Sequence, residues 1–255
     1  MKLGIVADIH GNVVALEAVL ADAAGVGIDR WWALGDLILF GPRPVEVLDV
    51  LRNLPGIAFV RGNTDRYITS GGQPQPHATA GDASGDPDLV ERYALLAAGV
   101  GWARGALSQG EALDFLDELP AQQRLHLPDG TRLLGVHASP GADDGPGIDN
   151  DSPSNRLADL FAGCDADLVA GGHTHDPTDR VVGGLRLVNG GSVGMPRRIQ
   201  GAGWLVVEAD GNGVRVEHRI AAFDVDSVCR DLGRRRHPNA AFVESVLRRS
   251  HPFAH

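Results

Sequence analysis

Five short, continuous apolar segments of the sequence each lead into a side chain that can bind a metal ion. The segments are bordered by glycine or charged residues, a pattern typical of buried strands, and span residues 3–7, 31–34, 57–60, 133–136 and 168–170. The polar residues that follow them are, in order, Asp8 and His10, Asp36, Asn63, His137, and His173 and His175. In an open α/β sheet, ligands bind outside the carboxyl ends of the strands, so we expect these seven side chains to converge there.

The spacing within the motifs has a physical meaning, because residues two apart share one side of an extended segment. We therefore expect Asp8 and His10 to face one ion together, and His173 and His175 to do the same if their segment is extended. Asp36 is the natural candidate to bridge two ions. Carboxylate, carboxamide and imidazole ligands without a thiolate suit Mn, Fe or Zn, and they exclude a Cu(I) or Fe–S site.

Each motif alone is weak, because an isolated Asp-x-His or a histidine at a strand end is usually a solvated polar residue. Five such motifs in a fixed order are far more specific. Their order resembles that of the calcineurin-like metallophosphoesterases, which is D-x-H, G-D, G-N, H and G-H-x-H. The opening Asp-Ile-His-Gly-Asn, and Asn-Gly-Gly-Ser-Val-Gly-Met-Pro-Arg at residues 189–197, are most similar to the small prokaryotic branch of YfcE-like phosphodiesterases.

The resemblance covers roughly residues 1–223 and implies an α/β fold in which a two-sheet β-sandwich is flanked by helices. This arrangement is the four-layer fold of the metallophosphoesterases. The corresponding domain division is a metallophosphoesterase domain at residues 1–223, with a helical insertion at about residues 66–120, and a C-terminal helical tail at residues 224–255. Alternating strand and helix patterns also argue for one domain over this length.

The resemblance further implies two divalent metal ions and a role for each ligand. One ion would be bound by Asp8, His10, Asp36 and His175, and the other by Asp36, Asn63, His137 and His173, with Asp36 as the bridge. A hydroxide held between the ions would attack phosphorus, and Asn63 would help to compensate charge on the phosphoryl oxygens. Arg43 and Arg197 are candidates for substrate contact, since a guanidinium matches phosphate, although a surface arginine is the more common case.

The implied activity is hydrolysis of phosphate esters, with phosphodiesters favoured over monoesters. Many superfamily members have a histidine directly after the motif asparagine, where it protonates the leaving group, whereas this chain has Thr64. Threonine cannot act as an acid near neutral pH, and His77 is one residue that could replace it. The alternatives are a protein Ser/Thr phosphatase, a dinucleoside polyphosphate hydrolase, and a non-catalytic metal-binding scaffold like the retromer subunit of this fold.

Local patterns predict the remaining elements. Asn12 is a favourable N-cap for a helix to about residue 24, and Pro44 suits the first turn of a helix to about residue 54. A mobile loop is expected at residues 69–87, followed by helices at residues 88–107 and 109–119. These two helices could form a substrate-selecting cap or cover one face of a sheet, and the sequence favours neither. Turn signals predict hairpins within residues 125–136, 180–188 and 204–218, which we expect to build a second sheet.

Composition limits the partners. The formal net charge of −10 over 255 residues makes DNA or RNA polymers unlikely partners and leaves a small phosphate ester as the expected substrate. Cys164 and Cys229 have no metal-binding spacing and suit a reducing cytoplasm. No segment has the length of a signal peptide or membrane span, so no membrane partner is expected, and a homo-oligomer is compatible with the sequence. The arginines at 234–236 are expected at a solvated helix end.

Overall fold

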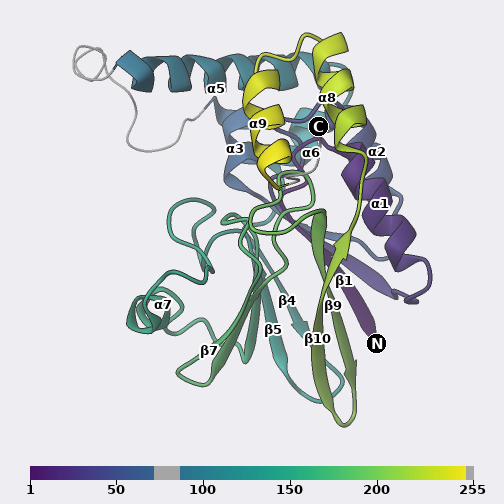
Figure 1. The fold of residues 1–255 in the computed structure, drawn as a ribbon. Helices are drawn as coiled ribbons and strands as arrows, with labels where there is room; N and C mark the ends of the chain where they lie inside the picture. Colours follow the sequence, from purple (N-terminus) through teal and green to yellow (C-terminus); the bar gives the residue numbers. More distant parts are fainter. Residues whose placement is uncertain (72–86, 251–255) are drawn as a thin grey trace.

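The structure, a computed structural model, describes residues 1–71 and 87–250 (Figure 1). One five-stranded sheet contains β1 (Lys2–Val6), β2 (Arg30–Leu34), β3 (Ala58–Val60), β9 (Ala202–Asp210) and β10 (Gly213–Ala221), in the order β10-β9-β1-β2-β3. The other contains β4 (Gln122–His126), β5 (Arg132–Val136), β6 (Leu168–Gly171), β7 (Thr178–Val182) and β8 (Leu185–Asn189), in the order β4-β5-β6-β8-β7. The helices in the described ranges are α1 (Val13–Ala23), α2 (Pro44–Arg52), α3 (Asn63–Ser70), α5 (Pro87–Ala106), α6 (Ala112–Asp117), α7 (Ser154–Leu160), α8 (Val225–Arg234) and α9 (Ala240–Ser250).

Each sheet contains three parallel strands. In the first sheet β1 pairs with β2 and β2 with β3, and in the second β5 pairs with β6 and β6 with β8. The strands β9, β10, β4 and β7 join them in antiparallel pairs. Because the parallel strands of a sheet end at one edge, the loops that follow them gather at that edge.

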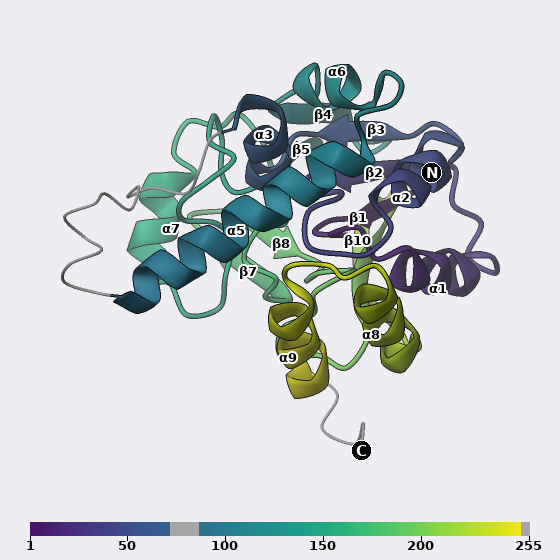
Figure 2. The ribbon, with the colours of Figure 1, turned by 90° about the horizontal axis from the view of Figure 1, so that it is seen from above.

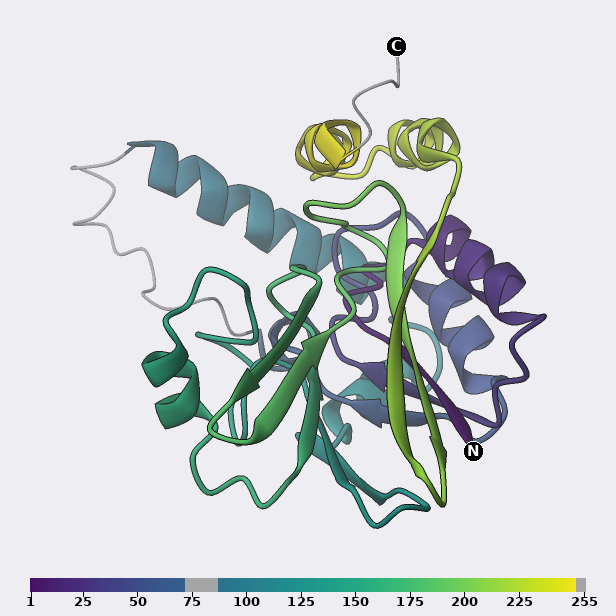
Figure 3. The same cartoon turned by 60° about the horizontal axis from the view of Figure 1, so that its bottom comes forward.

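The strands appear in the sequence as continuous apolar runs because successive side chains, which point to opposite faces, enter two different cores. On β2, Trp32 and Leu34 lie in a core between the two sheets, whereas Trp31 and Ala33 lie in a core shared with the helices. The β6 residue Val169 packs outward against the layer that holds α7. Figures 1 and 3 show α1 and α2 on the outer side of the first sheet and α7 on that of the second. This helix-sheet-sheet-helix layering confirms the predicted two-sheet sandwich flanked by helices.

The assignment of strands to sheets corrects one prediction. The hairpin of β9 and β10 does not join the second sheet, because β9 pairs antiparallel with β1 and extends the first. Both faces of β9 are apolar: Trp204 packs toward the helices and Leu205 toward the opposite sheet. A pattern of this kind predicts burial on both faces but does not say which sheet receives the strand. The five strands that precede the ligand motifs are divided between the sheets, with β1, β2 and β3 in one and β5 and β6 in the other.

The N-terminal helices follow the sequence closely. The Asn12 side chain accepts a hydrogen bond from the Ala15 backbone N–H at 3.1 Å, which confirms the predicted N-cap of α1. The helix α3 was not predicted. It is stabilised at its start by the Asp65 side chain, which accepts from the Gly62 N–H at 2.9 Å, and ends at Gly71 with φ +70°. Thr69 and Ser70 therefore belong to a helix and not to the expected loop.

Of the predicted loop, residues 72–86, which include His77, lie outside the described residues. The two helices expected after it are α5 and α6, and their apolar side chains join the core that also contains α1 and α2. The contributing residues are Leu96, Val100, Trp102, Ala103, Leu113, Phe115 and Leu116. This packing supports the interpretation of α5 and α6 as cover for a sheet face. The short helix α7 was not predicted.

The tail is helical, as expected. Seen from above, α8 and α9 lie side by side, and their apolar side chains form a small core of their own (Figure 2). Both lie at the end of the molecule toward which β1 runs (Figure 1). Arg235 contacts Glu46 and Asp231 at the end of α8. None of the helices in the described ranges is long and apolar enough to span a membrane.

Candidate metal centre and substrate clefts

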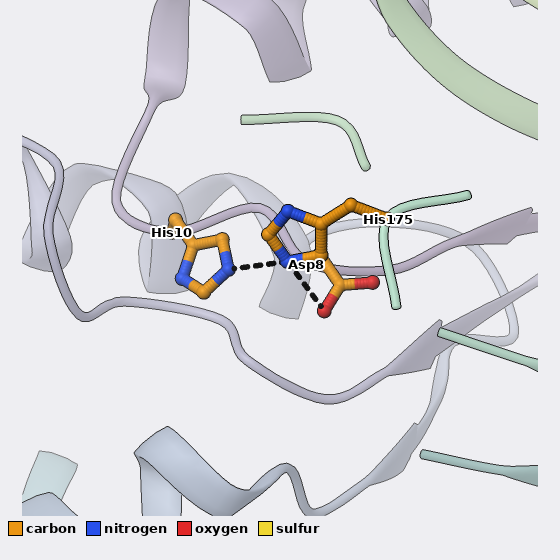
Figure 4. A group of neighbouring side chains, drawn as sticks. All are labelled: Asp8, His10 and His175. Carbon is orange, nitrogen blue, oxygen red and sulfur yellow. Dashed lines mark hydrogen bonds and ion pairs between the residues drawn. The ribbon is translucent and has the colours of Figure 1, made fainter. Parts of the chain in front are cut away.

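The loops after the parallel strands of both sheets bring the seven predicted ligands together. Asp8 and His10 follow β1, Asp36 follows β2, Asn63 begins α3 after β3, His137 follows β5, and His173 and His175 follow β6. Two overlapping groups have their ligand atoms within 4.8 Å of one another: Asp8, His10 and His175, and Asp8, Asp36 and His137. Figure 4 shows the first group, with His175 in contact with both other side chains.

The backbone at these residues is not extended. This corrects the expectation that the paired side chains face one ion because they lie two apart on an extended segment. The φ angles are +54° at Asp8, +50° at His10, +67° at His173 and +56° at His175, all in the left-handed region. The loop after β1 is held there by the next loop, because the His10 N–H donates to the Asp36 carbonyl at 2.9 Å. Convergence of the paired side chains therefore comes from tight turns, and not from the two-residue repeat of a strand.

Glycine is required where these loops approach each other. A Cβ atom at Gly172 would lie 2.7 Å from Oδ2 of Asp8, and one at Gly62 would overlap the Asp36 carboxylate. A larger residue at either position would displace a candidate ligand. The glycines of the G-N and G-H-x-H motifs thus have a packing role at the centre itself.

Backbone carbonyls fix the orientation of the imidazole rings. A carbonyl accepts a hydrogen bond from Nδ1 in three cases: Leu39 for His10 (3.0 Å), Leu34 for His137 (2.7 Å) and Met195 for His175 (2.8 Å). In the neutral ring each Nε2 is then the electron-pair donor, and it faces the centre. His173 is oriented in the opposite sense: its Nε2–H donates to the Gly145 carbonyl at 2.9 Å, so its Nδ1 faces inward.

The inward-facing donors lie too close together for a centre without a cation. Nε2 of His10 and Nε2 of His175 are 3.1 Å apart, and Oδ1 of Asn63 lies 3.1 Å from Nε2 of His137 and 3.0 Å from Nδ1 of His173. When the rings are neutral and the proton is on the outer nitrogen, these pairs place lone pair against lone pair. A positive ion between them removes the repulsion, so the residues present fit a metal centre.

Asp36 lies between the two groups of ligands. Its Oδ1 is 3.3 Å from Nε2 of His137, and its Oδ2 is 3.8 Å from Nε2 of His10. The Thr64 backbone N–H donates to Oδ1 at 2.9 Å, and Asp65 accepts from the Asp36 N–H at 2.9 Å. A carboxylate with its two oxygens directed to different histidines has the geometry of a bridging ligand.

Asp8 is also in contact with both histidines of the G-H-x-H motif. Its Oδ1 lies 3.3 Å from Nε2 of His175, and its carboxylate accepts a hydrogen bond from the His173 backbone N–H at 2.9 Å. Asp8 is fully buried and Asp36 is 3% exposed. Two buried carboxylates so close together call for positive charge nearby.

The electrostatics of the candidate ligands show why cations are attracted. Burial alone would raise the pKa of Asp36, but the imidazoles of His137 and His10 outweigh it and lower the pKa. The pKa of Asp8 is also lowered, because His175 outweighs the effect of burial. Burial alone would lower the pKa of His137, but the two carboxylates outweigh it and raise the pKa to about 10. Both carboxylates are therefore anionic at neutral pH, and nitrogen and oxygen donors in this number suit a divalent transition metal.

Two clefts open beside the centre. A cleft of about 610 Å³ has His175 in its wall, and a cleft of about 500 Å³ has His173 in its wall. Arg197 is exposed and lines both clefts. The structure thus places this predicted substrate residue where a group bound at the metal centre could reach it.

Arg43 lies elsewhere. Its Nε donates to Oδ2 of Asp231 on α8 at 2.5 Å, and its Nη1 lies 3.2 Å from Glu46. Neither cleft includes Arg43 among its described lining residues. The Arg43 guanidinium therefore binds α8. The sequence does not reveal this contact, because Asp231 lies 188 residues further along the chain.

Several residues of the site were not predicted as parts of it. Asp65 joins the G-D and G-N loops by accepting backbone hydrogen bonds from Asp36, Leu37 and Gly62, and burial together with the Asp36 charge raises its pKa to about 7. Phe242 and Arg249 of α9 line the larger cleft. The position of Asp65 two residues after the motif asparagine is a sequence signal for its role, whereas nothing in the tail sequence indicates that α9 reaches the site.

Comparison with known proteins agrees with this geometry. The model of the calcineurin-like phosphoesterase superfamily domain matches residues 1–212. The uncharacterized protein MJ0912 of Methanocaldococcus jannaschii is 29% identical over 210 residues, which are 76% of this chain and 77% of that protein. The symmetrical bis(5'-nucleosyl)-tetraphosphatase of Pectobacterium carotovorum is 36% identical over 70 residues, which are 27% of this chain and 25% of that enzyme.

Solved structures share the fold over nearly the whole chain. Protein PH1004 of Pyrococcus horikoshii has a TM-score of 0.77 at 22% identity and covers 96% of this chain and 97% of its own. A metallophosphoesterase of Sphaerobacter thermophilus has a TM-score of 0.71 at 26% identity and covers 97% and 98%. Yfce, a phosphoesterase of E. coli, has a TM-score of 0.46 at 21% identity and covers 87% and 100%. By the match over residues 1–212, the chain belongs to the calcineurin-like phosphoesterase superfamily.

Proposed function

We propose that this protein hydrolyses small phosphodiesters at a centre of two divalent metal ions. The observation that carries the proposal is the convergence of seven nitrogen and oxygen ligands beside two clefts, with Asp8 common to the two closest groups and Asp36 near a histidine of each. One set would contain Asp8, His10, Asp36 and His175, and the other Asp36, Asn63, His137 and His173. Mn, Fe or Zn suit these donors.

When bound, the ions would acidify a water so that it can attack phosphorus and would neutralise phosphoryl oxygens. The chain itself contributes orientation. Asp36 would belong to both ligand sets and so fix their positions relative to each other. Asn63 could also contact a phosphoryl oxygen. Arg197 would bind a non-bridging oxygen from the cleft side. In the net reaction, water adds to phosphorus and one ester P–O bond breaks, which yields a monoester and an alcohol.

Two features favour a diester over a monoester. A diester has two substituents on phosphorus, and the two clefts beside His173 and His175 provide a place for each. Thr64 is only 4% exposed, so no side-chain acid stands at the position that follows the motif asparagine. A substrate with a good leaving group needs no such acid.

A second candidate is hydrolysis of dinucleoside polyphosphates. It is favoured by the 36% identity to the symmetrical bis(5'-nucleosyl)-tetraphosphatase, although that match spans only a quarter of the enzyme. The intact ligand set argues against the alternative of a non-catalytic scaffold, and the missing histidine at residue 64 argues against a protein Ser/Thr phosphatase.

Metal analysis combined with two substitutions tests the proposal. Protein purified without chelator should contain two metal equivalents per chain and should hydrolyse bis(p-nitrophenyl) phosphate. Asp36→Ala should lose metal and turnover together, because it removes a ligand of both sets. Arg197→Ala should retain both metals and lose about tenfold or more in kcat/KM, the effect of removing one charge-assisted hydrogen bond.

Arg215→Ala is the matched control. It removes the same charge from an exposed side chain on β10 that contacts only Glu217 among the ion pairs of the described residues. Metal content and turnover should match the wild type. A single metal equivalent that does not change when Mn or Zn is added would contradict the two-ion proposal, and an active, metal-loaded Asp36→Ala variant would contradict the assigned site.

We also propose a cytoplasmic location. Cys164 and Cys229 are both free cysteines, and Cys164 is buried. Unpaired thiols of this kind suit a reducing compartment.

A further inference from the structure

One wall of the larger cleft is formed by α9, which lies outside the residues that match the superfamily. Phe242, Val246 and Arg249 line the cleft together with His175. Their spacing of four and three residues places them on one face of the helix. A helix that presents a face to a cleft beside a metal ligand can select what binds there, and here its residues lie outside the part of the chain that matches the superfamily model.

The lining of this cleft is positively charged, although the chain has a formal net charge of −10. It contains Arg197, Arg198 and Arg249 and, among described residues, no aspartate or glutamate. Arg198 is neutralised by Asp151 at 2.5 Å and Asp176 at 3.3 Å. Within the described part of the chain, no carboxylate lies within the 4 Å of an ion pair from Arg197 or Arg249. Arg249 donates from Nε and Nη2 to the Ser245 carbonyl and hydroxyl at 2.9 and 3.3 Å, so its charge, like that of Arg197, is not compensated by a carboxylate. Both charges can therefore attract an anion in addition to the metal centre.

The same cleft contains an exposed aromatic ring. Phe242 is 45% exposed, which is unusual for a large apolar side chain, and its ring centroid lies 5.7 Å from that of Phe40. Phe40 in turn lies 5.5 Å from the ring of His10 and has φ +86°, a conformation that bulky residues rarely adopt. Aromatic packing therefore runs from a candidate metal ligand to the cleft wall, where Phe242 offers a surface to a planar group.

We propose that the α9 wall binds one ester arm of the substrate, and that this arm carries an aromatic ring and a second anionic group. Phe242 packs against the ring and Arg249 binds the second anion, while Arg197 serves the scissile phosphate. Nucleotides have this combination of groups, and a cleft of about 610 Å³ lies in the size range of small-molecule sites. The inference rests on the proposed function, since the phosphodiester itself is held at the metal centre.

Three dinucleotides test the assignment: ApA, and the same molecule with a terminal phosphate at either end, pApA and ApAp. Wild-type protein should favour one of the phosphorylated forms over ApA by about tenfold in KM, the effect of one charge-assisted contact. Arg249→Ala should abolish this preference, so that its KM values for the three compounds agree within about twofold. Phe242→Ala should raise the KM for all three by about tenfold.

The control is again Arg215→Ala, which changes the net charge equally but lies on β10, away from the cleft lining. It should keep the wild-type preference, and all variants should retain the wild-type metal content. Absence of any preference in the wild type, or a preference that survives in Arg249→Ala, overturns the assignment.

If wild-type protein hydrolyses neither bis(p-nitrophenyl) phosphate nor any of the three dinucleotides, the proposed function fails. Calorimetric binding of the same dinucleotides then decides the α9 assignment separately. Tighter binding of a phosphorylated form that is lost in Arg249→Ala supports the assignment, and equal affinities for all three compounds overturn it.

Discussion

At the scale of single residues, Thr64 limits the chemistry more than any ligand does. Its backbone N–H donates to Asp36, while its hydroxyl is buried and has no hydrogen-bond partner among the described residues. Thr64 thus positions the Asp36 carboxylate with its backbone, and its buried hydroxyl cannot reach a leaving group. The departing oxygen must therefore leave without a proton from this position.

The expected consequence is a steep dependence of rate on the leaving group. Aryl diesters should be cleaved at least about a hundredfold faster than alkyl monoesters such as phosphoserine, because a general acid contributes about two orders of magnitude or more. Turnover measured on aryl and alkyl esters over a range of leaving-group pKa values checks this. A flat dependence, with hydrolysis still rate-limiting, would show that another group supplies the proton.

The identities of the candidate ligands could be predicted from sequence, but the conformations that bring them together could not. Five of the seven, Asp8, His10, Asp36, His173 and His175, have positive φ. Such conformations are costly for any residue with a side chain and persist only where surrounding structure enforces them. Here the enforcing contacts come from other loops, for example Asp65 to the Asp36 N–H, and a local pattern contains no information about them.

At the scale of elements, the α8–α9 pair depends on contacts with the N-terminal half of the chain. Arg43 is bound to Asp231 of α8, and the Asn239 side chain donates to the Leu95 carbonyl of α5 at 2.8 Å. The ring of His237 lies 4.4 Å from that of Trp102. These contacts position the wall that lines the larger cleft, so weakening them should loosen α9 without affecting the metal ligands.

A double-mutant cycle on Arg43 and Asp231 measures the strongest of these contacts. The two side chains are 38% and 16% exposed, so solvent screens the pair and the coupling energy should be about 0.5–1 kcal/mol. Arg43→Ala should also speed hydrogen exchange of α9, because that helix packs on α8, while metal content stays normal. Unchanged exchange in α9, or zero coupling, would show that the helices are held by other contacts.

At this scale, the elements that could be predicted were those marked by local apolar or capping patterns. The strand positions and the N-cap of α1 are confirmed, since short apolar runs and capping asparagine act locally. The placement of β9 and β10 was wrong because pairing with β1 joins residues about 200 positions apart. The helix α3 was missed because its start depends on the Asp65 side chain and its buried face contacts α5 and α6.

At the scale of the whole molecule, the candidate metal centre joins the two sheets. Asp8, Asp36 and Asn63 follow strands of the first sheet, whereas His137 and the two histidines of the G-H-x-H motif follow strands of the second. The sheets are also held together by apolar contacts between their inner faces and by polar contacts, such as those of His218 on β10 with the carbonyls of Thr178 and Asn189. Metal ions would therefore act as cross-links between the two halves of the fold, and their binding free energy would add to its stability.

Removal of metal should accordingly lower the melting temperature of the whole domain. A metal present at a hundred times its dissociation constant stabilises the native state by about 2.7 kcal/mol, which for a chain of this size corresponds to roughly 5–10 °C. Chelator-treated protein should melt earlier by about that amount, and added Mn²⁺ should restore the loss, as followed by calorimetry. Asp36→Ala is the matched control, because without the shared carboxylate its melting temperature should respond little to either treatment. If wild type and Asp36→Ala respond to Mn²⁺ equally, the stabilising ions bind elsewhere and the ligand set at the sheet junction is not their site.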